Sequence, residues 1–281
     1  MHPALYWEKT DGSTVKCRLC PHNCEIEIDE KGICGGRENS GGSLFATHYG
    51  LVSSLALDPI EKKPLRRFHP GSQILSVGGF GCNFCCPYCQ NSSISLEYER
   101  SDGEVLTPEQ ILALAKQSVS HGNIGVAYTY NEPVVGYEFI NDCAKLIAKA
   151  GLQNVLVTNG FINKEPLEQI LPLISAMNID LKAFSPEFYQ NVGGDLAMVK
   201  RTIEAVHQHC HLEVTTLVIP GENEEDITEL AKWIAIIDPD IPLHIGRFVP
   251  RYRYAGHQPA TTALTTRLGK VASEWLNYVY T

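Results

Sequence analysis

Three cysteines near the end of the first third of the chain have a spacing that indicates chemistry. Cys82, Cys86 and Cys89 are separated by three and then two residues, and glycines precede them. A short, glycine-introduced loop with this spacing can surround an iron–sulfur cube and ligate three of its irons. The fourth iron then stays open to a small molecule, and the aromatic Tyr88 just before the last cysteine could cover an adenine.

A fourth cysteine in the same stretch, Cys85, allows a second interpretation. Cys82-x2-Cys85 and Cys86-x2-Cys89 can also be read as two knuckles of a four-cysteine zinc site. That interpretation does not account for the motifs that follow. A disulfide is less favoured still, because nothing at the N-terminus resembles an export signal and we expect a reducing cytoplasm.

A second set of cysteines lies in the first part of the chain, at Cys17, Cys20, Cys24 and Cys34. Four thiolates in under twenty positions suit a tetrahedral zinc or an auxiliary cluster. The alternatives are unligated thiols of a small glycine-rich appendage, or thiols that contact the substrate. We expect His22, which stands alone between two of them, to be a surface residue rather than a ligand.

Composition excludes several classes of protein. The 281 residues include 23 lysines and arginines against 32 acidic residues, a net charge of −9, and the basic residues form no long run, so a nucleic-acid grip is not expected. No apolar run reaches the roughly 18 residues of a membrane span. Ten cysteines in a cytosolic protein indicate metal or redox chemistry.

The elements that position these residues follow a regular pattern from residue 73 onward. Apolar, β-rich runs alternate with amphipathic stretches, which favours an α/β fold with a parallel sheet, either an open doubly wound sheet or a partial barrel. The predicted strands are residues 74–77, 124–130, 154–158, 176–181, 212–219 and 243–248. Thr107 begins a capping box, Asn223 is predicted to cap a later helix, and the last helix is expected near residues 263–276.

The carboxyl ends of these strands carry many polar residues. In both architectures reactive groups gather at that edge, where they could hold a zwitterionic, sugar-bearing ligand over the cluster. The polar residues there are Tyr128, Thr129, Tyr130, Asn131, Glu132, Thr158, Asn159, Asp180, Lys182, Thr215, Thr216, His244 and Arg247. Residues 57–65, with two prolines and alternating charges, are predicted to be a connector or a cover over one edge of the barrel near the cluster.

Several motifs together resemble a known family. The cysteine loop, Asn131-Glu132-Pro133, Thr158-Asn159-Gly160-Phe161 and Asp180-Leu181-Lys182 resemble, in order, the motifs of pyruvate formate-lyase activating enzyme and other radical S-adenosylmethionine (SAM) enzymes. The chain is more similar still to the AmmeMemoRadiSam system radical SAM enzymes. That similarity rests on Cys-x2-Cys-Pro-His-x-Cys, on the sequence from Asp58 to Leu65, on Cys86-Pro87-Tyr88-Cys89-Gln90-Asn91, and on the sequence from His244 to Tyr252.

The resemblance implies a partial (β/α)6 TIM-like barrel at residues 71–281 and a small Cys-rich N-terminal appendage and linker at residues 1–70. It implies one [4Fe-4S] cluster, ligated by Cys82, Cys86 and Cys89, and bound SAM. The remaining implied cofactor-binding residues are Tyr88 and Gln90 near the adenine, Asn131 and Glu132 in the turn that contacts the SAM amino group, Thr158 and Asn159 on the next strand, and Asp180, Lys182 and His244 around SAM and the substrate.

Plainer roles remain open for the same residues. Asp180 and Lys182 could simply pair, Thr158 and Asn159 could merely end a strand, and Glu132 could be a helix-start acid. His244 could be a satisfied histidine at the barrel mouth. We expect Cys143 and Cys210 to be small buried hydrophobic residues.

The implied reaction is reductive cleavage of SAM to a 5′-deoxyadenosyl radical that removes hydrogen from a substrate. The implied partners are an electron donor such as flavodoxin or ferredoxin, and Memo-type and AMMECR-type proteins or a protein substrate. Two alternatives stay open: an activating enzyme that acts on a glycine of a partner protein, and a non-enzymatic zinc-binding interaction module.

Overall fold

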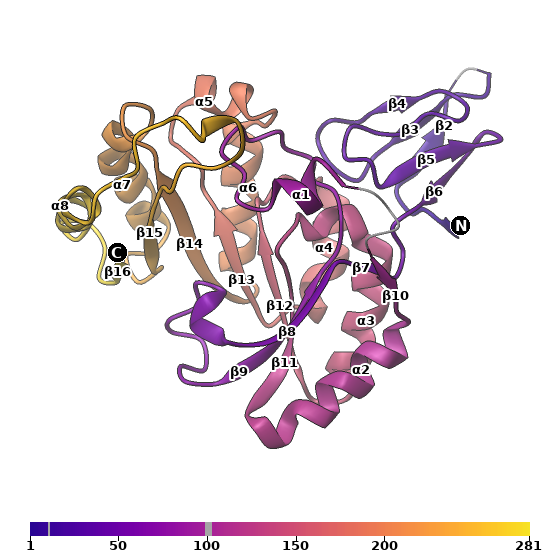
Figure 1. Ribbon diagram of the computed structural model, residues 1–281, viewed down its shortest axis with the longest axis horizontal. Coiled ribbons are helices and arrows are strands. Elements are labelled where there is room, and N and C mark those ends of the chain that lie inside the picture. Colours follow the sequence, from indigo (N-terminus) through magenta and orange to yellow (C-terminus); the bar gives the residue numbers. More distant parts are fainter. Residues whose placement is uncertain (11, 99–102) are drawn as a thin grey trace.

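An eight-stranded sheet forms the centre of the computed structural model, which describes residues 1–10, 12–98 and 103–281. Seven strands run parallel, and β8 pairs antiparallel with β9 at one edge. In spatial order the strands are β16 (Val279–Tyr280), β15 (Leu243–Arg247), β14 (His211–Val218), β13 (Ala176–Asp180), β12 (Gln153–Thr158), β11 (Asn123–Thr129), β9 (Gln73–Gly78) and β8 (Ser54–Pro59). The sheet curves into the partial barrel that the sequence predicted (Figure 1).

Helices follow the parallel strands and bury their apolar faces against the sheet, as amphipathic helices do. They are α1 (Ser92–Ser95), α2 (Pro108–Gln117), α3 (Tyr137–Lys149), α4 (Lys164–Ile170), α5 (Pro186–Asn191), α6 (Leu196–His207), α7 (Ile227–Ile237) and α8 (Thr262–Ala272). The capping box at Thr107 is confirmed, since its hydroxyl accepts from Gln110 N and the Gln110 side chain accepts from Thr107 N. No described helix has the length and apolar character needed to cross a bilayer.

The six predicted strands are confirmed to within one residue at each end, but the predicted cap at Asn223 is wrong. Asn223 makes no side-chain cap, and α7 starts later, at Ile227. Its amide instead accepts from Ile219 N at 2.8 Å and donates to Lys182 O at 2.8 Å and Leu217 O at 2.9 Å. Asn223 therefore joins the carboxyl ends of β13 and β14.

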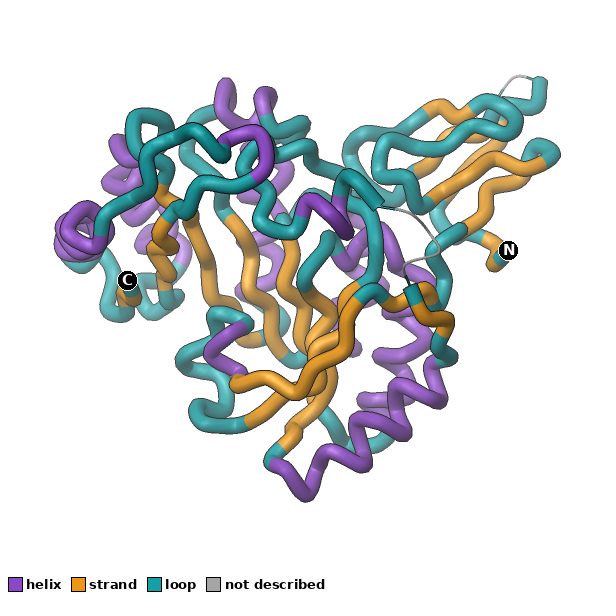
Figure 2. Tube along the Cα trace, in the orientation of Figure 1, coloured by secondary structure: helices purple, strands orange, loops and turns teal. Residues whose placement is uncertain are grey.

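The N-terminal residues form small sheets at one end of the molecule, opposite α8 (Figures 1 and 2). One sheet contains β2 (Trp7–Lys9), β3 (Val15–Cys17) and β4 (Glu25–Ile26), and a second contains β1 (His2–Pro3), β6 (Ser43–Ala46) and β5 (Arg37–Ser40). A ribbon of β7 (Leu51–Val52) and β10 (Glu104–Val105) follows. The buried Arg37 pairs with the buried Glu138 of α3, which fixes these sheets to the barrel.

Residues 57–65 were predicted to be a connector or a cover over one edge of the barrel, but residues 57–59 belong to β8. The residues that follow, 60–68, are here named the floor segment. They instead cross the inner face of the barrel. Ile60 and Leu65 pack in a buried cluster with residues of β9, β11, β12 and β13. Pro64 O accepts from the Asn178 amide at 2.9 Å, and Arg66 N and Arg67 N donate to Glu213. Because β8 already belongs to the sheet, the barrel sheet begins before residue 70; the division into two domains at that residue remains a prediction.

Candidate functional site

The cysteine loop follows β9 at the carboxyl edge of the sheet and is held by bonds to distant segments. Gly81 N donates to Ile94 O at 2.9 Å, and Cys85 N donates to Val192 O at 2.9 Å. Gly81 has a φ of 85°, and a Cβ there would lie 2.5 Å from Cys34 O. Only glycine fits both this left-handed conformation and this close approach. The loop is therefore fixed in place against the N-terminal sheets.

Three thiols of this loop border one cavity of about 360 Å³. Cys82, Cys86 and Cys89 all line it, whereas Cys85 lines a different cavity. The first cavity also contains most of the polar residues that the sequence singled out: Tyr88, Gln90, Asn131, Glu132, Thr158, Asn159, Asp180 and Lys182. The structure thus separates Cys85 from Cys86 and Cys89, against the two-knuckle arrangement of a zinc site.

The sulfur of Cys82 already accepts hydrogen bonds. Phe84 N donates to Cys82 Sγ at 3.3 Å, and the Asn159 amide donates to it at 3.9 Å. Burial raises the pKa of Cys82 well above its ordinary value, and burial raises the pKa of Cys86 to about 11. Burial thus favours the neutral thiol at both positions, while N–H donors are in place to stabilise charge on Cys82.

Glu132 joins the ends of two strands. Its buried carboxylate accepts from Thr158 Oγ1 at 2.7 Å, Asn159 N at 2.8 Å and Val134 N at 3.0 Å. Burial raises the pKa of Glu132 to about 7, although these donors act in the opposite direction. Glu132 does begin a short helical turn at Pro133, as the plainer reading expected. It also fixes Thr158 and Asn159 at the cavity wall, so it is more than a helix-start acid.

Asn131 clamps the start of the cysteine loop. Its amide oxygen accepts from Gly79 N at 2.9 Å, and its Nδ2 donates to Gly81 O at 3.1 Å. The preceding residue, Tyr130, has a φ of 73°, a left-handed conformation that is rare for a bulky side chain. The turn after β11 therefore carries local strain where it meets the loop, as functional sites often do.

Asp180 and Lys182 pair on one side of the cavity. Lys182 Nζ lies 2.6 Å from Asp180 Oδ2, so the expected ion pair is present. Burial would lower the pKa of Lys182, but the Asp180 carboxylate raises it above its ordinary value. Both residues still border the cavity, so pairing does not withdraw them from the site.

Tyr88 and Gln90 flank the last cysteine in different environments. Tyr88 is buried, and its ring centroid lies 6.1 Å from that of Phe188 and 5.9 Å from that of Tyr254. Gln90 is exposed at the cavity edge. The two side chains together offer one apolar and one polar surface beside Cys89.

His244 is the predicted site residue that the structure does not bring to this cavity. Its Nε2 lies 2.6 Å from Glu213 Oε2, and its ring stacks on Tyr280 at 5.1 Å between centroids. It is absent from the described residues that line the cavity. The predicted cofactor contact did not take Glu213 into account. This buried carboxylate lies inside the barrel and holds the imidazole of His244.

Sequence reasoning overlooked two cavity residues, Lys62 and Lys63 of the floor segment. Lys62 Nζ donates to Asp58 Oδ1 at 3.0 Å, and Lys63 Nζ donates to Asp58 Oδ2 at 2.8 Å. Two adjacent lysines after a strand were the available signal. Nothing local indicated that they point into the barrel.

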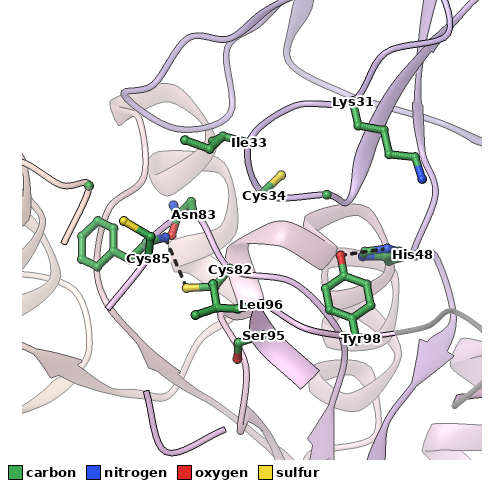
Figure 3. A pocket seen from close by; sticks show the side chains of 13 residues that line it. Lys31, Ile33, Cys34, His48, Cys82, Asn83, Cys85, Ser95, Leu96 and Tyr98 are labelled. Carbon is green, nitrogen blue, oxygen red and sulfur yellow. Dashed lines mark hydrogen bonds between the residues drawn. The ribbon is translucent and has the colours of Figure 1, made fainter. Parts of the chain in front are cut away.

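One of the N-terminal cysteines, Cys34, lies beside this site. Cys34 shares the second cavity, of about 420 Å³, with Cys82 and Cys85 (Figure 3). His22 is half-buried and contacts Asn83 O through its Nε2 at 2.7 Å, so it is a loop contact rather than a free surface residue.

All ten cysteines are free thiols, and burial raises the pKa of Cys20 to about 12 and of Cys34 to about 11. Cys143 is fully buried as expected, whereas Cys210 is half-buried after α6. Within the described ranges, no three histidine, cysteine, aspartate or glutamate side chains form a group suited to a single metal ion. Metal binding by the N-terminal cysteines remains a prediction.

Comparison with known proteins decides the family. The model of the radical SAM superfamily matches residues 76–234, which include the cysteine loop and the strand ends around the cavity. The chain belongs to the radical SAM superfamily. It is a radical SAM enzyme, and this family uses a [4Fe-4S] cluster and SAM.

Individual relatives agree with this assignment. An uncharacterized protein of Methanocaldococcus jannaschii is 39% identical over all of this chain and 84% of its own length. Pyruvate formate-lyase 1-activating enzyme of Escherichia coli is 25% identical over 52% of this chain, a match that spans 61% of that enzyme. A radical SAM methyltransferase from Sphaerobacter thermophilus has the same fold, with a TM-score of 0.56 at 15% identity over 99% of this chain and 75% of that one.

The residues of this radical SAM enzyme fit the family's cofactors. The cysteine loop offers three thiols to the cavity, which is the usual ligand type of iron–sulfur clusters, and one sulfur has N–H donors of the kind that tune such clusters. The adjoining wall supplies carboxylate, amide, hydroxyl and ammonium groups for a zwitterion. Thiols and polar wall therefore suit a cluster and SAM side by side.

Proposed function

We propose that Cys82, Cys86 and Cys89 hold the [4Fe-4S] cluster and that SAM binds in the cavity they border. One observation carries the proposal: three thiols of a single loop open into the same cavity as Glu132, Asn159, Asp180 and Lys182, while the neighbouring Cys85 does not. With these groups bound, the cluster would supply one electron for cleavage of the SAM C–S bond, and the products would be methionine and a 5′-deoxyadenosyl radical able to remove hydrogen from the substrate.

The chain's own residues then bind and orient. Asp180 and Lys182 offer opposite charges to the amino and carboxylate groups of SAM, and Asn131 keeps the cysteine loop beside them. Thr158 and Asn159, fixed by Glu132, form the cavity wall beside the ligand. Tyr88 and Gln90 are assigned to the adenine. The buried wall excludes the water that would quench a radical.

His244 is assigned a different role from the one predicted. Its bond to Glu213 makes it a positioning residue for the floor segment, because Glu213 also accepts from Arg66 N at 3.0 Å and Arg67 N at 2.8 Å. It therefore acts on the cavity through Lys62 and Lys63, and does not contact SAM.

For partners and substrate we propose the finer assignment that the motifs favour, an AmmeMemoRadiSam system enzyme that works with Memo-type and AMMECR-type proteins in the cytoplasm. An electron donor such as flavodoxin or ferredoxin supplies the electron. The likeness to an activating enzyme supports a second candidate, action on a glycine of a partner protein. Anaerobic pull-down followed by a 5′-deoxyadenosine assay with each partner distinguishes the two.

The test of the proposal is anaerobic reconstitution with iron and sulfide. We expect about four irons and four sulfides per chain, and SAM-dependent release of 5′-deoxyadenosine under reducing conditions. Cys86→Ala should lose both the cluster and the release, whereas the matched variant Cys85→Ala should keep both. Release of 5′-deoxyadenosine by Cys86→Ala would refute the ligand assignment, and zinc without sulfide would favour the interaction module.

A further inference from the structure

The floor segment forms a second end of the cavity. The positive charges of its lysines have no role in the proposed binding of the cluster and SAM. Lys62 and Lys63 line the same cavity as the thiols. They belong to the floor segment, which follows β8 in the chain and crosses the inner face of the barrel. Thr215 of β14 also lines the cavity, and its hydroxyl is held by Asn178 at 2.9 Å. These residues are separate in sequence from every motif assigned to SAM.

Among the residues that the structure describes, Asp58 is the one carboxylate that these two lysines contact, and it has other donors. Its Oδ2 accepts from Lys63 at 2.8 Å, from Ser76 Oγ at 3.0 Å and from Tyr130 Oη at 2.6 Å. Only Oδ1 is left for Lys62, at 3.0 Å. Although burial would raise the pKa of Asp58, these donors lower it below its ordinary value. Asp58 is therefore a saturated anion that neutralises one ammonium and not two.

The ammonium groups, by contrast, are not saturated. An ammonium has three N–H donors, and each of these lysines makes one side-chain hydrogen bond within the described part of the chain. Lys63 is 2% exposed, so water cannot readily satisfy its remaining donors. The Tyr130 ring also lies near this ammonium, with its centroid 4.5 Å from Nζ. A buried ammonium with spare donors favours an anionic partner.

The other charged residues that line the cavity lie at the carboxyl ends of the strands, away from the floor segment. Lys182 and Asp180 neutralise each other at 2.6 Å, and Glu132 is turned to its own three donors at the ends of β11 and β12. The floor end thus carries one positive charge in excess of its carboxylate.

We propose that Lys62 and Lys63 form an anion subsite that binds a carboxylate or phosphate group of the substrate. This inference rests on the proposed function, because it places the substrate in the cavity that also takes SAM. The subsite anchors the substrate at the floor while the cysteine loop holds the cofactors at the other end. Substrates with a carboxylate or phosphate some distance from the reacting C–H are the class that fits.

The experiment titrates malonate and inorganic phosphate separately into reconstituted, unreduced protein by calorimetry, with and without saturating SAM. We expect at least one probe to bind in both conditions, and the tighter one identifies the group on the substrate. Lys62→Gln should weaken binding about tenfold, the loss of one charge-assisted contact, and Lys62→Arg should retain it. Lys62 is the residue to change because its side chain is largely exposed.

Lys232→Gln is the matched control. Like the floor lysines, Lys232 contacts one carboxylate, Glu229 at 2.8 Å, and its Nζ lies 5.2 Å from the centroid of an aromatic ring, that of Trp275. Unlike them, it lies on α7, outside the cavity lining. It should bind the probes as the wild type does. The inference would be overturned if neither probe binds, or if Lys62→Gln binds the probes as tightly as the wild type. It would also be overturned if SAM abolishes probe binding, a result that would assign the lysines to the SAM carboxylate.

The titration requires no turnover. Probe binding without 5′-deoxyadenosine release would contradict the proposed function alone. Release without probe binding would contradict the subsite alone.

Discussion

Two buried glutamates at opposite ends of the barrel interior have opposite electrostatic environments. Glu132 at the cysteine loop is 3% exposed and Glu213 beneath the floor segment is 0% exposed, yet the pKa of the first is raised to about 7 and that of the second is lowered to about 2. Burial raises both. The difference lies in the donors: Glu132 meets a hydroxyl and two backbone N–H groups, whereas Glu213 meets two backbone N–H groups and two imidazoles, His211 and His244.

The comparison indicates how one cavity combines two tasks. The cysteine end uses neutral donors around a carboxylate, which leaves its charge free to respond to a bound cofactor. The floor end uses ion pairs that fix residues 60–68 permanently against the strands. Beyond the single 3-10 turn Ile60–Lys62, this segment has no regular structure and needs such anchors, because its own backbone supplies few.

The largest expected effect is at the floor, from Lys63→Met. This change leaves the carboxylate of Asp58 buried with Lys62 as its only cation, and loss of one partner of a buried pair costs about 3–5 kcal/mol. Denaturant unfolding should show that decrease. Lys16→Met, which removes an exposed pair with Glu25 at 3.3 Å, should cost under about 1 kcal/mol.

The double variant Asp58→Asn/Lys63→Met checks the cause. It also removes the buried carboxylate that has lost its buried cation, and it should therefore recover part of the loss. If the double variant is no more stable than Lys63→Met, then packing of the lysine stem, and not charge, holds the floor segment.

The next effect is the acid sensitivity contributed by Glu213. Its folded-state pKa is lowered from 4.5 to about 2, so the stabilisation is fully present above pH 4.5 and is lost as the pH falls toward 2. The shift corresponds to about 3 kcal/mol. Unfolding measured from pH 5 to pH 2 should therefore be steeper for the wild type than for Glu213→Gln. Parallel curves for the two proteins would show that the imidazoles do not stabilise this carboxylate.

These two ends also differ in how far the sequence could predict them. The strands and the cysteine loop depend on local features, such as apolar runs, caps and thiol spacing, and each predicted strand end lies within one residue of the observed one. The Glu132 motif was likewise local. The floor segment depends on contacts with Glu213, which is 147 residues from Arg66. No local pattern marks such a pairing, so residues 57–65 resembled a connector, and His244 was assigned to SAM without its true partner.

The smallest expected effect comes from Glu132, at the cysteine end of the cavity. It changes stability with pH in the direction opposite to that of Glu213. The folded-state pKa of Glu132 is raised from 4.5 to about 7, so the folded state holds a proton that the unfolded state releases between these values. Stability of the cluster-free protein should therefore fall as the pH rises from 5 to 7, by about 2 kcal/mol from this residue.

Glu132→Gln cannot ionise and should lack this decline, while its amide oxygen in the place of Oε1 still accepts from Thr158 Oγ1 and Val134 N. The measurement is thermal unfolding of both proteins across that pH range, with Glu109→Gln, in the exposed first turn of α2, as the control that keeps the wild-type slope. A wild-type protein whose stability rises from pH 5 to pH 7 relative to Glu132→Gln would show that the three donors outweigh burial. The two glutamates would then behave alike, and the contrast between the ends of the cavity would lie in the lysines of the floor segment alone.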